Sequence, residues 1–334
     1  MIHPITLGNL ALSSNIFCAP LAGCSDFPFR RMTKRFQPGL IFCEMVKMEA
    51  LIRNDPNTFR LLDYAADMHP IGGQICGSNP HIAAQSAKII EDLGFDLVDL
   101  NCGCPVDKVT KDGSGSGLLK TPERIGEILC NMRSAVNIPI TLKIRAGWDE
   151  DSINVEEIVA VAEEAGASAI CIHGRTRQQG YKGAANRGYI RRGKKSAKKI
   201  PVIGNGDIFD VASAESMFQE TDCDAILIAR GTMGQPWLIE DIIRHFSEMP
   251  IEERGGQDLR ALFLEHYREV VAYASGRKAL LDMRRISCWY LKMLKNCAEM
   301  RHAMSRASSL EQISKEIDNF SWERVTGALQ VEEV

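Results

Sequence analysis

The strongest constraint on the fold is a pattern that occurs eight times along the chain. A short apolar run is followed by a turn rich in glycine, asparagine, serine or proline, and then by a segment of helical periodicity. Helix candidates between the apolar runs include residues 80–93, 121–136, 155–165, 212–220 and 237–246. The apolar runs lie at residues 15–20, 40–45, 71–76, 95–101, 138–144, 169–173, 201–204 and 225–229. Because no tandem hairpin signal interrupts the alternation, the sheet should be parallel, with helices outside it.

Eight such units in about 245 residues have the size of a closed (β/α)8 barrel, the TIM barrel. The apolar strands are nearly uninterrupted, as expected for a sheet covered on both faces. An open doubly wound sheet is the alternative, but its usual G-x-G-x-x-G turn is absent after the first strand. In a barrel, chemistry should be located at the carboxyl ends of the strands.

The pattern changes after residue 246. Met249-Pro250 and Gly255-Gly256 indicate a linker over residues 247–257, and the chain beyond it shows only helical periodicity. We therefore expect an α/β barrel over residues 1–246, followed by a small C-terminal helical bundle over residues 258–334.

Composition is typical of a globular protein in a reducing compartment. Hydrophobic residues make up 45% of the 334 and charged residues 25%, and no run of about 18 apolar residues is long enough to span a membrane. The 11 cysteines form no C-x-x-C pair, and no histidines stand at metal-ligand spacing. We expect a cytoplasmic protein without signal peptide, zinc or other metal, and a monomer by default.

Positive charge is concentrated in two runs, although the net charge is only −3. Residues 187–199 contain seven basic and no acidic residues, and residues 275–306 contain eight basic and two acidic ones. Such a run is commonly a solvated helix face. The alternative is a surface that binds an anionic polymer.

Four of the predicted strands end on a polar residue, namely Gln74, Asn101, Lys143 and His173. Each has an ordinary explanation by itself, since Lys143 could pair with Glu44 and His173 could be a rim histidine. Together they would form a polar ring around the barrel mouth. An ammonium in an apolar strand is costly to bury unless something anionic or electron-rich meets it.

The last two strand ends suggest a phosphate site. Asn205-Gly206-Asp207 and Arg230-Gly231 offer glycine amides beside helix starts, where barrels hold phosphate after strands seven and eight. A phosphorylated cofactor is therefore expected.

A turn with two cysteines, Cys102-Gly103-Cys104-Pro105, follows the fourth strand, and glycines at 113, 115 and 117 follow in a polar segment. The P-loop pattern is absent, so we interpret that segment as a flexible lid. A thiol on the rim is mostly protonated at neutral pH and can donate a proton, or it can be a nucleophile if activated. Both cysteines could equally be merely small residues.

Four long motifs resemble one enzyme family. They are D-L-N-C-G-C-P-V-D-K-V (99–109), L-K-I-R-A-G-W (142–148), I-H-G-R-T-R-Q-Q-G-Y (172–181) and V-I-G-N-G-D-I (202–208). With A-P-L-A-G at 19–23 and W-Y-L-K at 289–292, they are similar to the tRNA-dihydrouridine synthases, which are flavin enzymes. The resemblance is closest to the bacterial B-type class and extends into the C-terminal helices.

The resemblance implies roles for particular residues. Cys104 would be the catalytic acid, and Lys143 would face the N1/O2 side of the flavin ring. Asn101, Arg145 and Tyr181 would contact the target uridine, and the helical domain would grip tRNA. The residues around FMN would be Pro20, Leu21, Ala22, Gln74, Lys143, His173, Asn205, Gly206, Asp207, Ala229 and Arg230.

The implied reaction reduces the C5=C6 bond of specific D-loop uridines in tRNA. NADPH, or NADH, would reduce FMN, which passes hydride to uracil C6 while Cys104 protonates C5. The target base would swing out of the tRNA fold into the barrel mouth. Two rival interpretations are an FMN barrel acting on a free pyrimidine or another small substrate, and a flavin-free RNA-binding protein.

The chain departs from the family pattern at three places. Asn186 and Arg187 stand where an Asp-Trp pair is expected, which questions the packing of the following helix. Ala229 replaces a glycine, so the amide geometry of the phosphate site is in question. Ile286 stands in place of a histidine, so no histidine role is carried over there.

Overall fold

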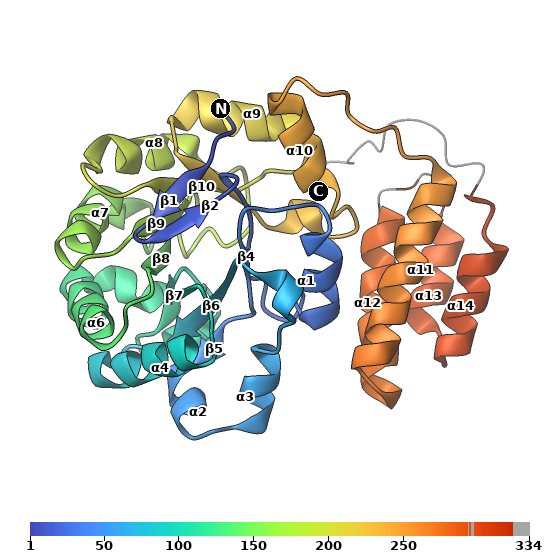
Figure 1. Ribbon diagram of the computed structural model, residues 1–334, viewed down its shortest axis with the longest axis horizontal. Helices are drawn as coiled ribbons and strands as arrows, with labels where there is room; N and C mark the ends of the chain where they lie inside the picture. Colours follow the sequence, from blue (N-terminus) through green and yellow to red (C-terminus); the bar gives the residue numbers. More distant parts are fainter. Residues whose placement is uncertain (293, 295–296, 323–334) are drawn as a thin grey trace.

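A parallel β-barrel ringed by helices forms the larger part of the protein, and a helical bundle lies beside it (Figure 1). The computed structural model describes residues 1–292, 294 and 297–322. Within this part of the chain, no helix is long and apolar enough to cross a membrane.

The barrel strands confirm the predicted α/β barrel, and all eight lie at the expected places. Neighbouring strands are parallel, and the pairing of the first with the last, together with a bridge from Phe17 to Leu40, brings the sheet round into a ring. The second predicted strand is divided, because β5 (Val46–Lys47) pairs with the same neighbour further along. The strands are β3 (Ile16–Cys18), β4 (Ile41–Phe42), β6 (Ile71–Cys76), β7 (Leu97–Cys102), β8 (Ile140–Arg145), β9 (Ala169–His173), β10 (Val202–Asn205) and β11 (Ala225–Ile228).

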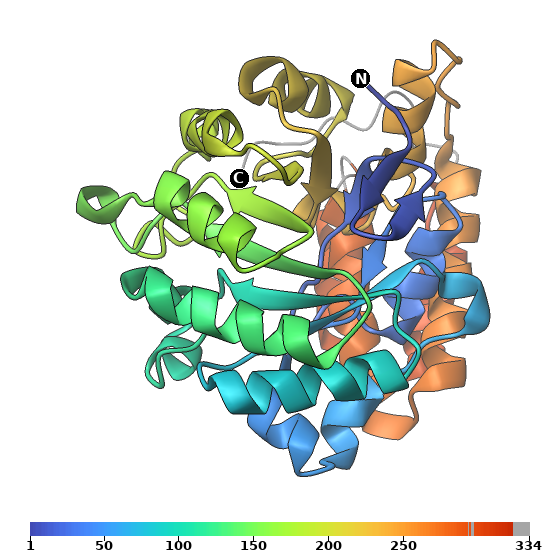
Figure 2. The same cartoon turned by 60° about the vertical axis from the view of Figure 1, so that its left-hand side comes forward.

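Helices surround this sheet, as the turned view in Figure 2 shows. The five predicted helices are confirmed as α4 (Pro80–Asp92), α6 (Pro122–Ala135), α7 (Val155–Glu164), α9 (Val211–Thr221) and α10 (Leu238–Phe246). The barrel helices outside those five ranges are α1 (Phe27–Lys34), α2 (Met48–Ile52), α3 (Pro56–Leu61), α5 (Asp107–Thr110) and α8 (Arg187–Ser196).

An antiparallel hairpin that was not predicted precedes the barrel. Strands β1 (Ile5–Leu7) and β2 (Leu10–Leu12) flank a two-residue turn in which Gly8 has a φ of 60°. Leu7 and Leu12 are buried in the cluster that fills the barrel interior. The hairpin therefore closes the amino-terminal end of the barrel, and its Gly-Asn turn is the sequence signal that could have predicted it.

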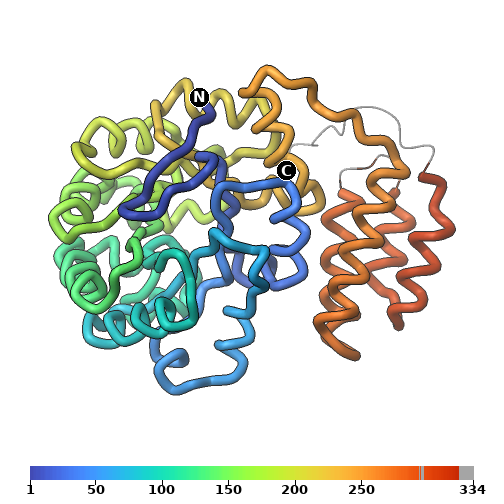
Figure 3. Tube along the Cα trace, in the orientation of Figure 1, coloured from blue at the N-terminus to red at the C-terminus, as the bar shows by residue number. Residues whose placement is uncertain are grey.

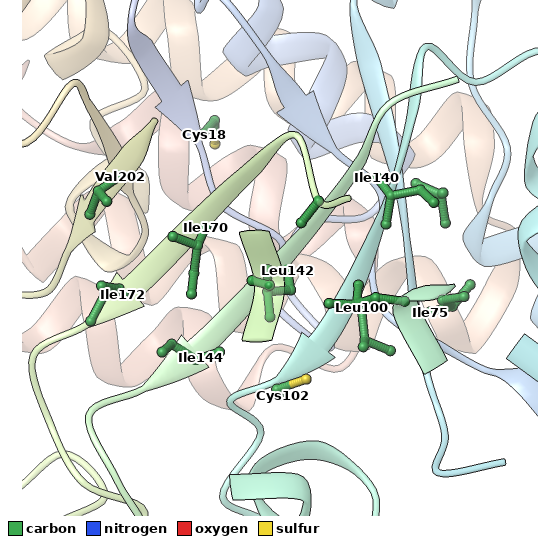
Figure 4. Close-up of a cluster of buried hydrophobic side chains, with 14 of the residues drawn as sticks. Cys18, Ile75, Leu100, Cys102, Ile140, Leu142, Ile144, Ile170, Ile172 and Val202 are labelled. Atoms are coloured by element: carbon green, nitrogen blue, oxygen red, sulfur yellow. The ribbon is translucent and has the colours of Figure 1, made fainter. Parts of the chain in front are cut away.

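Alternate residues of each strand face opposite sides of the sheet. In β8, the outward-facing Ile140, Leu142 and Ile144 join the buried cluster that includes side chains of the surrounding helices (Figure 4). The intervening residues Thr141 and Lys143 line cavities inside the barrel. The last inward-facing side chain of each strand thereby reaches the barrel mouth.

The C-terminal helices pack around a second buried cluster. It contains Phe263, Met283 and Ile286, so Ile286 fills the bundle core where the family pattern has a histidine. The trace in Figure 3 shows the segment after α10 leading to this bundle. The helices are α11 (Gly256–Tyr273), α12 (Gly276–Lys292), α13 (Ala298–Arg306) and α14 (Leu310–Asn319). Residues 323–334 of the expected domain lie outside the described residues.

Aromatic contacts attach the bundle to helix α1 of the barrel. The rings of Phe27 and Tyr273 stack with centroids 4.8 Å apart, and Phe29 meets Trp289 edge to face at 6.2 Å. The two parts therefore share an apolar interface, which gives the bundle a defined position relative to the barrel.

Both basic runs are only partly ion-paired. The first run forms α8, which begins normally because Asn186 accepts a hydrogen bond from the Gly188 N–H at 2.9 Å. Three of its basic residues form ion pairs with neighbouring segments: Arg187–Glu220, Arg192–Glu156 and Lys194–Asp224. The others have no ion-pair partner among the described residues, namely Arg191, Lys195, Lys198 and Lys199. In the second run, the exposed residues Arg277, Lys292 and Arg306 likewise have no ion-pair partner within the described part of the chain.

Candidate active site

A cavity of about 400 Å³ opens at the carboxyl ends of the barrel strands. The structure brings all the residues predicted for catalysis, cofactor and uridine into its wall. They are Pro20, Leu21, Ala22, Gln74, Asn101, Cys104, Lys143, Arg145, His173, Tyr181, Asn205, Gly206, Asp207, Ala229 and Arg230. Their roles remain predictions, but their gathering follows from strand polarity, because parallel strands end at the same edge of the barrel.

Strand register places the polar side chains at matching heights. Asn101 lies beside Lys143 across β7 and β8, and Arg145 lies beside His173 across β8 and β9. His173 in turn lies beside Asn205. Because each pairing is fixed by backbone hydrogen bonds, these side chains form one continuous arc of the cavity wall.

Lys143 carries an ammonium with no hydrogen-bond acceptor among the described residues. Glu44, considered above as its partner, instead accepts a hydrogen bond from the backbone N–H of Gly23. Burial lowers the pKa of Lys143, and Arg145 adds to this effect, whereas Cys171 and Asp99 oppose it. An ammonium exposed only to the cavity fits an anionic or electron-rich group there.

His173 is a neutral imidazole at neutral pH. Burial and then the charges of Lys143, Arg145, Arg175 and Arg230 hold its pKa well below the usual range. Its Nε2 accepts a hydrogen bond from Arg175 Nη1 at 3.3 Å, so Nδ1 carries the proton and can donate to a bound group without adding to the positive charge of the wall.

Asp207 joins two arginines below the rim. Its carboxylate accepts from Arg175 at 2.6 and 2.8 Å, from Arg230 at 3.0 Å and from the Ala185 N–H at 2.8 Å. Burial raises its pKa, but the Arg175 and Ala185 hydrogen bonds outweigh this and the net pKa is lowered. Asp207 thus remains ionised and positions Arg230, whose guanidinium lies 4.5 Å from the Tyr181 ring centroid.

The loops after β10 and β11 need glycine at two positions. Gly206 has a φ of 126°, and a Cβ at Gly231 would lie 2.1 Å from the carbonyl oxygen of Ile208. The backbone N–H groups of Gly206 and Arg230 donate to no acceptor in the described chain. Ala229 has a φ of −108°, outside the left-handed region that favours glycine, and a ψ of −104°. Free amides beside an arginine suit a phosphate.

The two cysteines of the turn occupy different environments. Cys102 faces outward and is fully buried between β7 and the helices, where burial raises its pKa well above the usual range. Cys104 is half-buried and lines the cavity. Cys102 is therefore a packing residue, and only Cys104 can act on a molecule in the cavity.

The backbone around Cys104 is held from two sides. Its N–H donates to Asn101 Oδ1 at 2.9 Å, and its carbonyl oxygen accepts from the Ser116 N–H at 3.1 Å and Oγ at 2.9 Å. The segment interpreted as a flexible lid is packed instead, because Ser114, Leu118 and Leu119 are buried. That interpretation is wrong: the glycines there permit a tight, ordered turn.

Arg145 uses several of its N–H groups to hold the surrounding loops and does not present all of them to the cavity. It donates to the carbonyl oxygens of Gly103 at 3.0 Å, Thr176 at 2.8 Å and Gly180 at 2.7 Å. Its guanidinium lies 5.5 Å from the ring centroid of Tyr181, which is 56% exposed at the rim. Arg145 thus joins the cysteine turn to the loop that carries Tyr181.

Asp99 is a buried carboxyl beneath the cavity that the sequence analysis did not single out. It accepts from Thr141 Oγ1 at 2.6 Å and from Gln74 Nε2 at 2.7 Å. Burial raises its pKa to about 6, although hydrogen bonds from Thr141 and Gln74 and the Lys143 charge oppose the rise. The available signal was an acidic residue two positions before Asn101, on the same strand face.

The raised pKa of Asp99 predicts a pH dependence of stability. The folded chain binds this proton more tightly than the unfolded chain, so the stabilisation is lost as pH rises through about 6. Between pH 5 and pH 8, wild type should lose about 1 kcal/mol of unfolding free energy relative to Asp99→Asn. Urea unfolding of both proteins measures the difference, and a pH-independent difference would contradict the prediction.

Within the described residues, no group of three or more His, Cys, Asp or Glu side chains is arranged to hold a metal ion. The charged wall of the cavity is instead mainly cationic, with Lys143, Arg145 and Arg230 around it. The site is therefore suited to an organic group that carries negative charge.

Known proteins share both the sequence and the fold of this chain. A family model described as "Dihydrouridine synthase (Dus)" matches residues 17–325. A "Probable tRNA-dihydrouridine synthase" of Rickettsia bellii is 36% identical, over 90% of this chain and 93% of that protein. "tRNA-dihydrouridine synthase B" of Pseudomonas aeruginosa is 32% identical, over 96% of each chain.

Solved structures show the fold alone, since their sequence identity is low. A histamine dehydrogenase from Rhizobium sp. 4-9 covers 80% of this chain and 50% of its own, with a TM-score of 0.57 and 15% identity. Morphinone reductase covers 77% of this chain and 91% of its own, with a TM-score of 0.53 and 13% identity.

Proposed function

The chain belongs to the dihydrouridine synthase family, with B-type tRNA-dihydrouridine synthases among its relatives, and we propose that it reduces D-loop uridines of tRNA using FMN and NADPH. One observation carries this proposal. The Cys104 thiol and the unpaired Lys143 ammonium line the same cavity, so a proton donor and a site for an electron-rich ring face one space.

The residues present fit FMN. Lys143 would meet the electron-rich N1/O2 edge, and the free amides of Gly206 and Arg230 would hold the phosphate. When bound, FMN supplies the hydride that reaches uracil C6, after reduction by NADPH. The remaining residues proposed to hold it are Pro20, Leu21, Ala22, Gln74, His173, Asn205, Asp207, Ala229 and Arg230.

Cys104 supplies the other half of the hydrogen. Hydride addition at C6 builds negative charge at C5 and O4, and the thiol proton passes from Sγ to C5. Lys143 and Arg145 line the cavity together with Cys104. A proton from solvent then restores the thiol for the next turnover.

Asn101 and Tyr181 are suited to hold the uracil. One N–H of Asn101 Nδ2 donates to Gln74, and the other faces only the weak acceptor Met45 Sδ at 3.5 Å. That N–H can donate to a uracil carbonyl. The exposed ring of Tyr181 offers a surface for the extruded nucleotide, and Arg145 keeps the loop of Tyr181 in place.

The proposed division of labour assigns FMN and catalysis to residues 1–246 and tRNA binding to residues 258–334. It is supported by the exposed, unpaired Arg277, Lys292 and Arg306 of the bundle. Such residues bind phosphates, and structured RNA is recognised largely through its backbone and shape.

The direct test uses purified protein and tRNA taken from cells that lack it. Flavin is identified by absorbance and mass, and dihydrouridine is mapped by mass spectrometry after incubation with NADPH. Dihydrouridine at D-loop positions is expected. A yellow protein that reduces free uridine but not tRNA would favour the small-substrate enzyme, and a colourless one that binds tRNA would favour the binding protein.

Lys143→Met should weaken flavin binding. The substitution keeps most of the unbranched side chain but removes the charged end, and a charged hydrogen bond to a buried partner is worth about tenfold or more in affinity. Flavin released per mole of protein, and flavin fluorescence quenching on titration, measure the loss. Lys88→Met on the surface of α4 is the control, and equal affinity of the two variants would contradict the role of Lys143.

A further inference from the structure

We propose that Asp99 is a positioning residue, which fixes the orientation of two side-chain amides and through them holds the turn that carries Cys104. The inference rests on the proposed function of Cys104 as the acid. It concerns a residue that touches neither the cavity above it nor any group proposed to bind there.

Asp99 lies inside the barrel, one layer below the mouth. It is 3% exposed and borders a small void of about 10 Å³, together with Thr141, Lys143 and Cys171. The positive charge of Lys143 interacts with the Asp99 carboxyl and opposes the rise of its pKa. A buried carboxyl is costly unless it is hydrogen-bonded, so the partners of Asp99 indicate what it does.

An ionised carboxylate only accepts hydrogen bonds, and this fixes the first amide. Asp99 Oδ2 lies 2.7 Å from Gln74 Nε2. Gln74 must therefore turn its NH2 group toward Asp99, and its oxygen Oε1 faces the other way. There it accepts from Asn101 Nδ2 at 2.8 Å.

The second amide is that of Asn101, and the backbone N–H groups of the Cys104 turn fix its orientation. Asn101 turns its nitrogen to Gln74, so its oxygen Oδ1 faces the backbone N–H groups of Gly103 at 3.1 Å and Cys104 at 2.9 Å. Backbone N–H groups only donate, so both ends of the chain of hydrogen bonds demand the same direction. The chain runs unbroken from the Cys104 N–H to the Asp99 carboxylate.

If Asp99 could no longer accept a hydrogen bond, nothing would hold the Gln74 amide in its present orientation. Gln74 would have a buried NH2 group without a partner, and rotation of its amide would turn an oxygen elsewhere and release Asn101. The Cys104 turn would lose the hydrogen bonds to Asn101, leaving those from Ser116 and Arg145. Proton transfer is sensitive to such displacement because the donor must lie within hydrogen-bond reach of the reacting carbon.

The test separates the two half-reactions of the holoenzyme by stopped-flow absorbance: flavin reduction by NADPH and flavin reoxidation by tRNA. Asp99→Val fills the space without an acceptor, and we expect reoxidation by tRNA to slow about tenfold or more. Reduction by NADPH should change less than about threefold, since Cys104 takes no part in it. Equal slowing of both steps would overturn the proposal.

Thr141→Val is the matched control, because it removes the other hydrogen bond to the same carboxylate but leaves the path to Cys104 intact. It should leave reoxidation within about threefold of wild type. Asp99→Asn should recover most of the rate, since its amide oxygen can still accept from Gln74 while its NH2 group donates to Thr141. Failure of Asp99→Asn to recover more than Asp99→Val would also overturn the proposal.

The double variant Asp99→Asn/Thr141→Val keeps the buried volume and is the test to use if Asp99→Val does not fold. The amide introduced at position 99 then has no acceptor in Thr141 and is free to turn its NH2 group toward Gln74. This would reverse the donor and acceptor roles along the hydrogen bonds that lead to Cys104. Reoxidation should slow about tenfold, more than the product of the two single effects. Multiplicative effects would contradict the proposal.

Alkylation of Cys104 by iodoacetamide, followed by peptide mass spectrometry, gives a readout that does not depend on tRNA. We expect the rate at Cys104 to change at least threefold in Asp99→Val and to stay unchanged in Thr141→Val. Exposed Cys130 is the internal reference. If wild type fails to pass electrons to tRNA, the proposed function fails, whereas an unchanged alkylation rate in Asp99→Val refutes the positioning role.

Discussion

Replacing Cys104 with alanine is expected to lower the rate of dihydrouridine formation about a thousandfold, while NADPH still bleaches the bound flavin at nearly the normal rate. The sulfur lines the cavity, but the turn is held through its backbone by Asn101 and Ser116. The substitution therefore removes the proton donor without releasing the turn. Mass spectrometry of tRNA and anaerobic flavin spectra measure the two effects.

Cys24→Ala is the matched control, because Cys24 is also half-buried and lines the same cavity. It is expected to retain dihydrouridine formation within a few-fold of wild type. If Cys104→Ala modified tRNA normally, or if the loss followed Cys24 instead, the acid would have been assigned to the wrong residue.

Reversing the unpaired charges of the bundle should have the largest effect on tRNA affinity. The triple variant Arg277→Glu, Lys292→Glu and Arg306→Glu is expected to weaken binding about a hundredfold at moderate salt. The slope of log affinity against log salt should fall by about two to three, one unit or slightly less for each phosphate that the variant no longer neutralises. Titrations over a salt series measure both, and the flavin content should not change.

A second triple variant with the same change in net charge tests whether net charge alone explains the loss of tRNA affinity. Lys195→Glu, Lys198→Glu and Lys199→Glu make the same change near the end of α8, ahead of β10 and so toward the amino-terminal end of the barrel. This triple variant should retain most of the affinity and of the salt slope. Equal losses in the two variants would show a general attraction, and no loss in the first would remove the bundle from the tRNA-binding surface.

Much of the fold follows from local sequence patterns. The eight strands and five of the helices have the expected positions, because hydrophobic periodicity and turn residues act over a few neighbouring residues. The same patterns predicted which residues surround the cavity, since residues such as Lys143 and His173 are the polar ends of apolar runs. The hairpin was missed because two three-residue strands are too short to show alternation.

The packed segment after Cys104 shows that composition alone does not predict whether a segment is mobile. Its glycines and serines are typical of a mobile loop, yet Leu118 and Leu119 bury it against the barrel. The first basic run shows the same limit, because the three acidic residues that pair with part of it, Glu156, Glu220 and Asp224, are distant in the sequence. Which basic residues of a run stay unpaired is therefore decided by the tertiary structure.

The sequence by itself therefore determined the barrel, the strand ends and the residues of the cavity wall. Only the tertiary structure decided that Cys102 packs outward while Cys104 faces the cavity, and that Arg145 is occupied by three carbonyl groups. It also revealed the path from Asp99 through Gln74 and Asn101. These contacts join different strands and loops, and strand register, which local periodicity does not encode, decides which atoms meet.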